Sequence, residues 1–119
     1  AIVMEMMSGR NLSNLTLNED QIDKVLDSIM IEVDNTFKAG YVHADLSEYN
    51  IFVDGMDATL FDWPQAVSID HENAEEFLER DIGNIVNYFE RKYPKNILVN
   101  DTKIIIEEII SGSFNSAMP

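Results

Sequence analysis

The chain has 119 residues, of which 45% are hydrophobic, so it can bury one modest core but not two independent ones. It contains no cysteine, which excludes disulfides and thiolate metal sites, and no apolar run approaches the roughly 18 to 20 residues that span a bilayer. Twenty-two acidic residues face eight basic ones, and the formal charge of −14 disfavours direct binding to nucleic acid. A cytoplasmic protein without membrane contact is therefore expected.

The N-terminal third is predicted to hold a strand end, a hinge and a long helix. The apolar run AIVMEM at 1–6 favours a buried strand, and the glycine of the following MSGRN breaks it. A start of this kind, without an initiator Met, indicates a piece of a longer protein. Apolar residues then recur at three- and four-residue steps over 18–39, which predicts an amphipathic helix. The stripe consists of Ile22, Val25, Leu26, Ile29, Val33 and Phe37. Thr16 and Glu19 have capping-box spacing at its start, and Gly40 can end it.

The remaining elements are predicted to be three short strands and two helices. Apolar residues at 41–43 and 51–53 flank the polar loop ADLSEYN, and Asp54-Gly55 begins a turn into a further strand at 58–61. A helix over 73–92 has its apolar residues on one face, and Pro94 closes it. A last helix over 102–110 is predicted to be capped by Asp101 and stopped by Gly112.

The octapeptide HADLSEYN, residues 43–50, matches the H-x-D-x-x-x-x-N catalytic loop of kinases. Phosphoryl transfer needs a carboxylate that orients the attacking hydroxyl and accepts its proton, and a nearby amide oxygen that binds a hard cation. Asp45 and Asn50 can fill these two roles. The motif alone is weak evidence, because isolated Asp and Asn residues usually cap helices or form turns.

A second carboxylate strengthens the case. Asp62 follows Asp45 by seventeen residues and ends the predicted strand at 58–61. The intervening hairpin would return Asp62 beside Asn50, so that three oxygen donors converge. The apolar strand before the loop, the strand after Asn50 and the placement of Asp62 together make a chance match improbable. The sequence therefore predicts a site with Asp45 as catalytic base and Asn50 and Asp62 as metal ligands.

The linked motifs resemble the RIO family of atypical serine/threonine protein kinases. Ser-Glu-Tyr before Asn50 is similar to the Ser-Glu-Tyr/Phe-Asn of that family. The run DWPQAVS from Asp62 resembles the Asp-Phe-Pro-Gln-x-Val-Ser of its second subtype, and HENAE from His71 fits the same subtype. Trp63 in place of Phe is a departure shared with some aminoglycoside phosphotransferases, and Ala44 is closer to the first RIO subtype. The resemblance covers about residues 1–93.

The resemblance implies an α+β fold: a protein-kinase-like C-terminal lobe, mainly helical, with a small antiparallel hairpin carrying the catalytic and metal loops. Residues 1–9 would then be hinge strand and linker and 10–119 the lobe, with the N-terminal lobe and any winged-helix domain outside this chain. The backbone of Glu5 and Met7 would bind the adenine edge, and Phe52 would form the floor of the adenine pocket. The Met residues of the run at 4–7 fit apolar strand packing equally well.

Three further residues receive roles by the same analogy. His43 is expected to support the loop structurally and not to shuttle protons. Asp81 would accept backbone hydrogen bonds from the catalytic loop, and the alternative is a helix-surface acid paired with Arg80 or Lys95. Ser47 would either contact phosphate or hold the loop in shape.

The implied function is ATP- and Mg-dependent (or Mn-dependent) phosphoryl transfer by a RIO-type kinase/ATPase, within small ribosomal subunit maturation. ATP and the precursor of the small subunit, or its protein factors, would be the partners. A Gly-rich phosphate loop and a strand Lys are not present in the sequence, so the chain by itself should be inactive or bind nucleotide weakly. Two alternatives stay open: a lobe of a small-molecule kinase of the aminoglycoside phosphotransferase type, and a non-catalytic interaction module.

Overall fold

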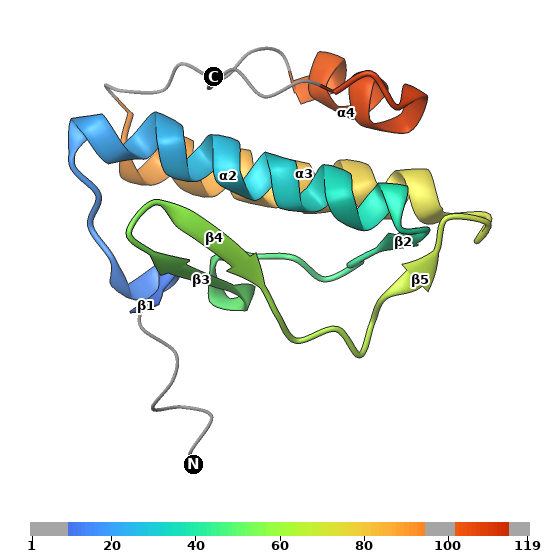
Figure 1. Cartoon of the computed structure of the whole chain (residues 1–119), viewed down its shortest axis with the longest axis horizontal. Helices are drawn as coiled ribbons and strands as arrows, with labels where there is room; N and C mark the ends of the chain where they lie inside the picture. The colour runs from blue at the N-terminus through green and yellow to red at the C-terminus, as the bar shows by residue number, and fades with distance from the viewer. Residues whose placement is uncertain (1–9, 95–101, 115–119) are drawn as a thin grey trace.

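A computed structural model describes residues 10–94 and 102–114. The chain order mixes short strands with three longer helices (Figure 1). The elements are β1 (Arg10–Asn11), the 3₁₀ turn η1 (Leu12–Asn14), α2 (Glu19–Lys38), β2 (Tyr41–Val42), the 3₁₀ turn η2 (Glu48–Asn50), β3 (Ile51–Asp54), β4 (Asp57–Leu60), β5 (Val67–Ser68), α3 (Ala74–Lys92) and α4 (Thr102–Ser111). The predicted strand at 1–6 and the predicted cap Asp101 lie outside the described residues.

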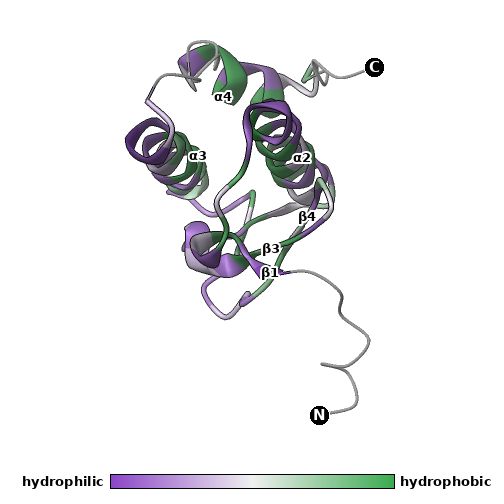
Figure 2. Ribbon diagram, turned by 90° about the vertical axis from the view of Figure 1, so that its left-hand side faces the viewer, coloured by the Kyte–Doolittle hydropathy of each residue, from purple (hydrophilic) through white to green (hydrophobic). Residues whose placement is uncertain are grey.

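The elements form three tiers. Helices α2 and α3 lie side by side in the middle, the strands β1, β3 and β4 lie on one side of them and α4 lies on the other (Figures 1 and 2). The first sheet has the order β1-β3-β4 and is antiparallel, while β2 and β5 form a separate antiparallel pair. This arrangement confirms the expected mainly helical α+β fold with a small antiparallel hairpin. None of the helices within residues 10–94 and 102–114 combines the length and apolarity that a bilayer crossing requires.

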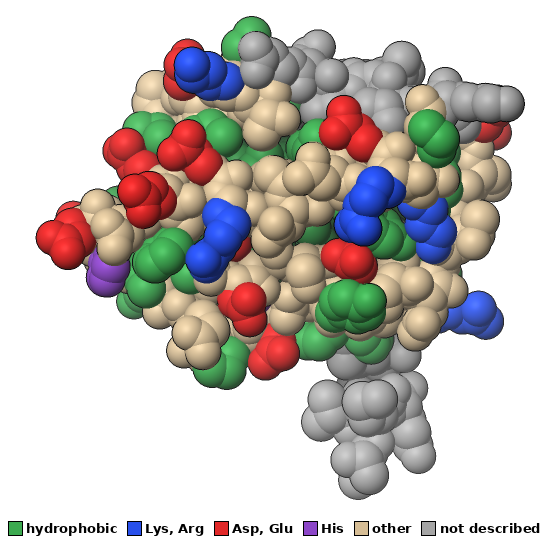
Figure 3. All heavy atoms as spheres, turned by 180° about the vertical axis from the view of Figure 1, so that it is seen from behind, with side chains coloured by type: hydrophobic (Ala, Val, Ile, Leu, Met, Phe, Trp, Pro, Cys, Tyr) green, Lys and Arg blue, Asp and Glu red, His purple; other side chains and the backbone are tan. Residues whose placement is uncertain are grey.

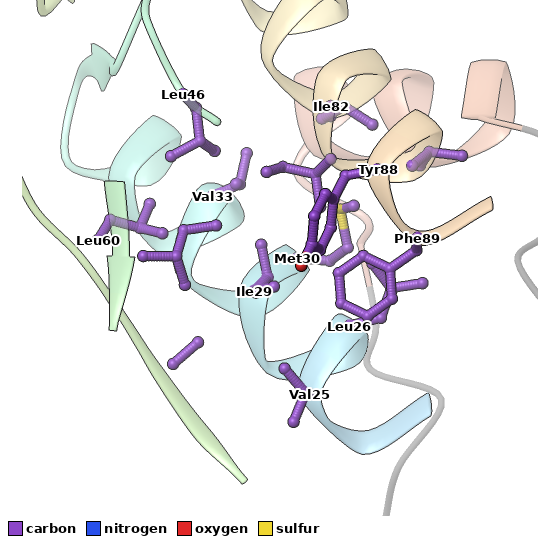
Figure 4. Close-up of a cluster of buried hydrophobic side chains, with 14 of the residues drawn as sticks. Val25, Leu26, Ile29, Met30, Val33, Leu46, Leu60, Ile82, Tyr88 and Phe89 are labelled. Carbon is purple, nitrogen blue, oxygen red and sulfur yellow. The ribbon is translucent and has the colours of Figure 1, made fainter. Parts of the chain in front are cut away.

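The core lies between the helices and the hairpin. The predicted stripe of α2 is buried except for half-buried Phe37, and it packs against apolar side chains of α3 such as Ile82 and Phe89 (Figure 4). Leu60 of β4 and Leu46 of the loop at 43–50 close the same cluster from the strand side. Burial of this kind supplies most of the free energy that holds short strands and long helices together.

The start of α2 differs from the prediction. The capping box consists of Asn18 and Gln21, not of Thr16 and Glu19. The Asn18 side chain accepts a hydrogen bond from the Gln21 amide at 3.1 Å, and the Gln21 side chain accepts one from the Asn18 amide at 3.2 Å. Asparagine is at least as good an N-cap as threonine. Beginning the helix at Glu19 also places two acids in the first turn, where their negative charges are attracted to the positive end of the helix dipole.

The short strands are the least predictable elements. Strands β1 and β5, each two residues long, carry no periodic signal and were not expected from the sequence. The hairpin is as expected: Asp54 pairs with Asp57, and Gly55 between them has a φ of 65°, which type II′ turns require at their first central position. Gly112 has a φ of 80° just after α4, as a helix-terminating glycine should.

Candidate phosphoryl-transfer site

His43 joins the catalytic loop to the segment that carries Asp62. Its ring is buried, and Nε2 lies 2.8 Å from the carbonyl oxygen of Phe61. Nδ1 accepts a hydrogen bond from the Asp45 amide at 3.3 Å. The neutral ring with its proton on Nε2 satisfies both contacts, since one nitrogen donates and the other accepts. His43 therefore holds the backbone before Asp62 next to the backbone of Asp45.

Asn50 and Asp62 lie next to each other at the ends of the hairpin. The Asn50 Nδ2 is 3.5 Å from Asp62 Oδ2, and the Phe61 amide donates to the Asn50 carbonyl at 2.9 Å. The Asn50 side chain is buried, whereas Asp62 and Asp45 are exposed. The hairpin thus returns Asp62 to Asn50. Asp45 belongs to the loop that His43 joins to the backbone of Phe61, just before Asp62.

Ser47 makes contacts within the loop. Its hydroxyl donates to Asn50 Oδ1 at 2.9 Å and accepts from the Tyr49 amide at 3.3 Å, which caps η2. The first bond orients the side-chain amide of Asn50, and the second fixes the short turn that contains Asn50. Of the two roles considered for Ser47, these contacts support loop stabilisation.

Asp81 of α3 binds the backbone of the loop at 43–50. Its side chain is 1% exposed, so it is not a helix-surface acid. It accepts hydrogen bonds from the amides of Ala44 at 2.8 Å and Leu46 at 3.0 Å, the contacts expected from the kinase analogy. Burial raises the pKa of the Asp81 carboxyl, and the two backbone hydrogen bonds oppose that rise.

Two supporting residues were not foreseen from the sequence. The Arg80 side chain donates to the carbonyl oxygen of Ala44, and the Asn84 side chain donates to that of Leu46 at 3.2 Å. Together with Asp81 they bind the amide and the carbonyl of both loop residues. The signal available in the sequence was their spacing. Residues 80 and 84 lie on the same part of the helix as Asp81, which was already expected to bind the loop.

Two backbone positions in the site are strained. Ala44 has a φ of 71° and Asp62 a φ of 67°, and these are the only non-glycine residues with positive φ in the described part of the chain. A left-handed conformation costs a residue with a Cβ roughly 1–2 kcal/mol. Strain of this kind is found preferentially at functional sites, where surrounding contacts enforce it. Here the residues before the proposed base and at the proposed metal ligand carry it.

The residues assigned to nucleotide are placed only in part. Phe52 of β3 is half-buried and packs edge to face on Phe61, with ring centroids 5.1 Å apart. Trp63 packs on His43 with centroids 4.7 Å apart, so the departure from Phe is accommodated by a ring contact. Glu5 and Met7 lie outside the described residues.

The oxygen donors fit a magnesium ion that also binds phosphate. Asn50 Oδ1 keeps a second lone pair beside its bond to Ser47, and the Asp62 carboxylate is exposed. The part of the chain that the structure describes holds no cluster of three His, Cys, Asp or Glu side chains able to enclose a metal. Mg²⁺ is usually held by one or two protein ligands together with phosphate and water oxygens, so an incomplete protein shell suits it.

Comparison with known proteins decides the family. The family model of the RIO domain matches residues 1–103. The chain belongs to the RIO family. The RIO-type serine/threonine-protein kinase Rio2 of Methanocaldococcus jannaschii is 40% identical over 114 residues, which cover 92% of this chain and 41% of that protein. The serine/threonine-protein kinase RIO2 of Caenorhabditis elegans is 34% identical over 93 residues, or 77% of this chain and 17% of that protein.

The RIO relationship extends to the fold. The Rio2 kinase of Chaetomium thermophilum, solved as a kinase-ADP/Mg2+-phosphoaspartate complex, superimposes with a TM-score of 0.67 at 23% identity. The superposition covers 90% of this chain and 38% of that one. The resemblance to the second RIO subtype and the kinase-like fold are confirmed. This chain spans less than half the length of each of these relatives.

Proposed function

We propose that this RIO chain is the C-terminal lobe of an ATP- and Mg-dependent phosphotransferase, with residues 10–119 as the lobe and 1–9 as its hinge. The observation that carries the proposal is the contact between Asn50 and Asp62 at 3.5 Å, on two segments that His43 joins to the backbone of Asp45. Residues far apart in the sequence thus come together with the ligand types that phosphoryl transfer uses.

Each of the three residues has a distinct task in this proposal. Asp45 orients the acceptor hydroxyl and takes its proton, and its exposure leaves it open to an incoming group. Asn50 and Asp62 would hold Mg²⁺, which would neutralise charge on the phosphates. Ser47, Asp81 and His43 keep these side chains in position. The Phe52 ring would form the floor of the adenine pocket, and the backbone of Glu5 and Met7, outside the described residues, would bind the adenine edge.

The cellular role that we propose follows from the family. RIO proteins act in maturation of the small ribosomal subunit, and this chain would serve there in the cytoplasm with the precursor or its protein factors as partners. The acidic surface fits a basic protein partner better than nucleic acid. A ribosomal role predicts that cells lacking the complete protein accumulate small-subunit precursors.

Three phosphoryl acceptors fit this proposal: a serine or threonine hydroxyl of a partner, a group of the enzyme itself, and water. The relatives are named serine/threonine-protein kinases, and the C. thermophilum structure contains phosphoaspartate. An acyl phosphate is cleaved by hydroxylamine, whereas a phosphoserine is not. The protein is phosphorylated with ATP that carries a labelled γ-phosphate and is then treated with hydroxylamine. Loss of the label indicates an ATPase that passes through an acyl phosphate, and retention of the label indicates a kinase that phosphorylates a hydroxyl.

The test is Mg-ATP turnover by the complete protein and its Asp45→Ala and Asp62→Ala variants. Asp62→Ala should abolish metal-dependent turnover, and Asp45→Ala should slow it by on the order of 10² or more. Asp57→Ala, which removes an exposed carboxylate of the hairpin, is the matched control and should keep wild-type turnover.

The alternatives make different predictions for the same assay. A non-catalytic interaction module would show no turnover in the wild type, or equal turnover in all variants. A small-molecule kinase would turn over ATP only when an aminoglycoside or similar acceptor is added. The family assignment favours the RIO-type reaction over both.

A further inference from the structure

An open groove lies directly beside the catalytic loop. Its volume is about 520 Å³, within the roughly 300–1,000 Å³ of typical ligand sites. The described residues that line it are Ser47, Glu48, Asn84, Asn87, Glu90 and Arg91. Ser47 caps η2 and Glu48 begins it, and the other four come from one side of α3. Figure 3 views the molecule from the side of α3, where acidic and basic side chains are interspersed on the surface.

Two residues of the groove lining contact the loop that carries the proposed site residues. Ser47 lines it and donates a hydrogen bond to Asn50 Oδ1, the proposed metal ligand. Asn84 lines it and binds the carbonyl of Leu46, next to Asp45. A molecule in the groove would therefore lie against the loop that carries the base.

The backbone of the lining is held in place, since it belongs to an anchored helix. The inner face of α3 is buried through Ile82 and Ile85, and Arg80 and Asp81 bind the loop at its other end. The spacing of 84, 87 and 91 places these side chains in line along the helix. A preorganised surface loses little entropy on binding, so even polar contacts here can contribute affinity.

The chemistry of the lining restricts the occupant. None of the six described side chains is apolar, which disfavours binding of a nucleobase, a lipid or an apolar peptide. Glu48 and Glu90 outnumber Arg91, whose Nε already donates to the Asn87 carbonyl at 3.3 Å, so an anionic ligand is also disfavoured. The side-chain amides of Asn84 and Asn87 suit peptide groups, which likewise offer one donor and one acceptor.

We propose that this groove binds the segment of the protein substrate next to the phosphoryl acceptor, and that Glu48 and Glu90 select lysine or arginine in that segment. The proposal rests on the proposed function, because it names the substrate class of the same site. It assigns a specificity role to residues other than the proposed base Asp45 and the proposed metal ligands Asn50 and Asp62.

Peptide binding to the complete protein tests the proposal without depending on turnover. Two short fluorescein-labelled peptides are compared by anisotropy: one has arginines beside a serine, and the other has alanines in their place. The basic peptide should bind the wild type more tightly, and Glu48→Gln with Glu90→Gln should reduce that preference roughly five- to tenfold, as expected for ion pairs to half-buried Glu48 and exposed Glu90. The matched control, Glu79→Gln with Glu107→Gln, removes two exposed acids elsewhere and should keep the preference.

Charge reversal supplies a second arm. Glu48→Lys with Glu90→Lys should shift the preference toward a peptide with glutamates beside the serine. Equal affinity of the wild type for basic and neutral peptides, or equal loss in the test and control variants, would overturn the proposal. Mg-ATP hydrolysis is measured on the same samples, so absence of turnover would count against the proposed function and leave the peptide result readable.

Discussion

At the scale of single residues, the site depends on a backbone held in an unfavourable conformation. Ala44 has a φ of 71°, and Asp81 and Arg80 bind its amide and its carbonyl. These hydrogen bonds offset the cost of the left-handed conformation, since a buried peptide group without partners would cost more. The peptide before Asp45, the proposed base, is thereby fixed in one orientation.

Replacing Ala44 by glycine should therefore be nearly neutral or stabilising. Glycine adopts positive φ without a Cβ penalty, which compensates for its greater freedom in the unfolded chain. Ala58→Gly is the control, because Ala58 is equally buried but lies in a strand with ordinary φ, and it should lose about 1 kcal/mol or more. Urea unfolding of both variants measures the difference, and an equal loss in both would contradict the strain.

Asp81→Asn should lower the free energy of unfolding by about 1–3 kcal/mol, because one of two backbone amides loses its acceptor. Burial raises the pKa of Asp81 above its ordinary 3.8, so the folded state binds more protons than the unfolded state between the two pKa values. The stability that protonation of Asp81 contributes is thus fully present below pH 3.8 and is lost as the pH rises through the pKa of the folded state. Urea unfolding across this range should show the stability difference between wild type and variant shrinking with pH; a difference that grows with pH would disprove the raised pKa.

At the scale of elements, α2 illustrates how a helix chooses its first residue. Two capping sequences overlap, and the structure uses Asn18 with Gln21. This choice places Ile22 and Val25 on the buried face while Glu19 and Asp20 occupy the first turn. Side-chain capping and burial thus favour the same starting point.

Asn18→Ala should consequently destabilise the protein by about 1 kcal/mol, the typical contribution of an N-cap. Thr16→Ala removes an exposed side chain outside the helix and should change stability little. Thermal unfolding followed by circular dichroism compares the two variants. If Thr16→Ala were the more damaging change, the capping box would lie where the sequence alone placed it.

At the scale of the whole molecule, α4 completes the core from the side opposite the sheet (Figure 2). Ile105, Ile106 and Ile109 are buried, and Ile109 is fully so, whereas Ile104 is 50% exposed. The helix is short, and its stability must come from this packing, since isolated helices of that length are marginal. The site and α4 are therefore supported by one common core.

Ile109→Ala should accordingly lower the free energy of unfolding by about 2–5 kcal/mol, the usual cost of emptying a buried position. Ile104→Ala, on the exposed side of the same helix, should change it by no more than about 0.5 kcal/mol. Guanidinium unfolding measures both. Equal small effects would mean that α4 does not share the core.

The sequence by itself determined the helices, the hairpin and the candidate site residues. Periodic apolar residues specify amphipathic helices because burial of one face is a local pattern, and the spacing of Asp45, Asn50 and Asp62 matches a motif that can be read directly from the chain. The family resemblance of the HADLSEYN and DWPQAVS segments was confirmed for the same reason.

Only the tertiary structure decided the rest. The positive φ of Ala44 and Asp62, the support of the loop by Arg80 and Asn84, and the short strands β1 and β5 all depend on partners distant in the chain. Such contacts leave no periodic trace, because a backbone carbonyl accepts a bond from any suitable donor that packing brings near it. The groove beside α3 has the same origin, since it exists only where η2 meets one face of the helix.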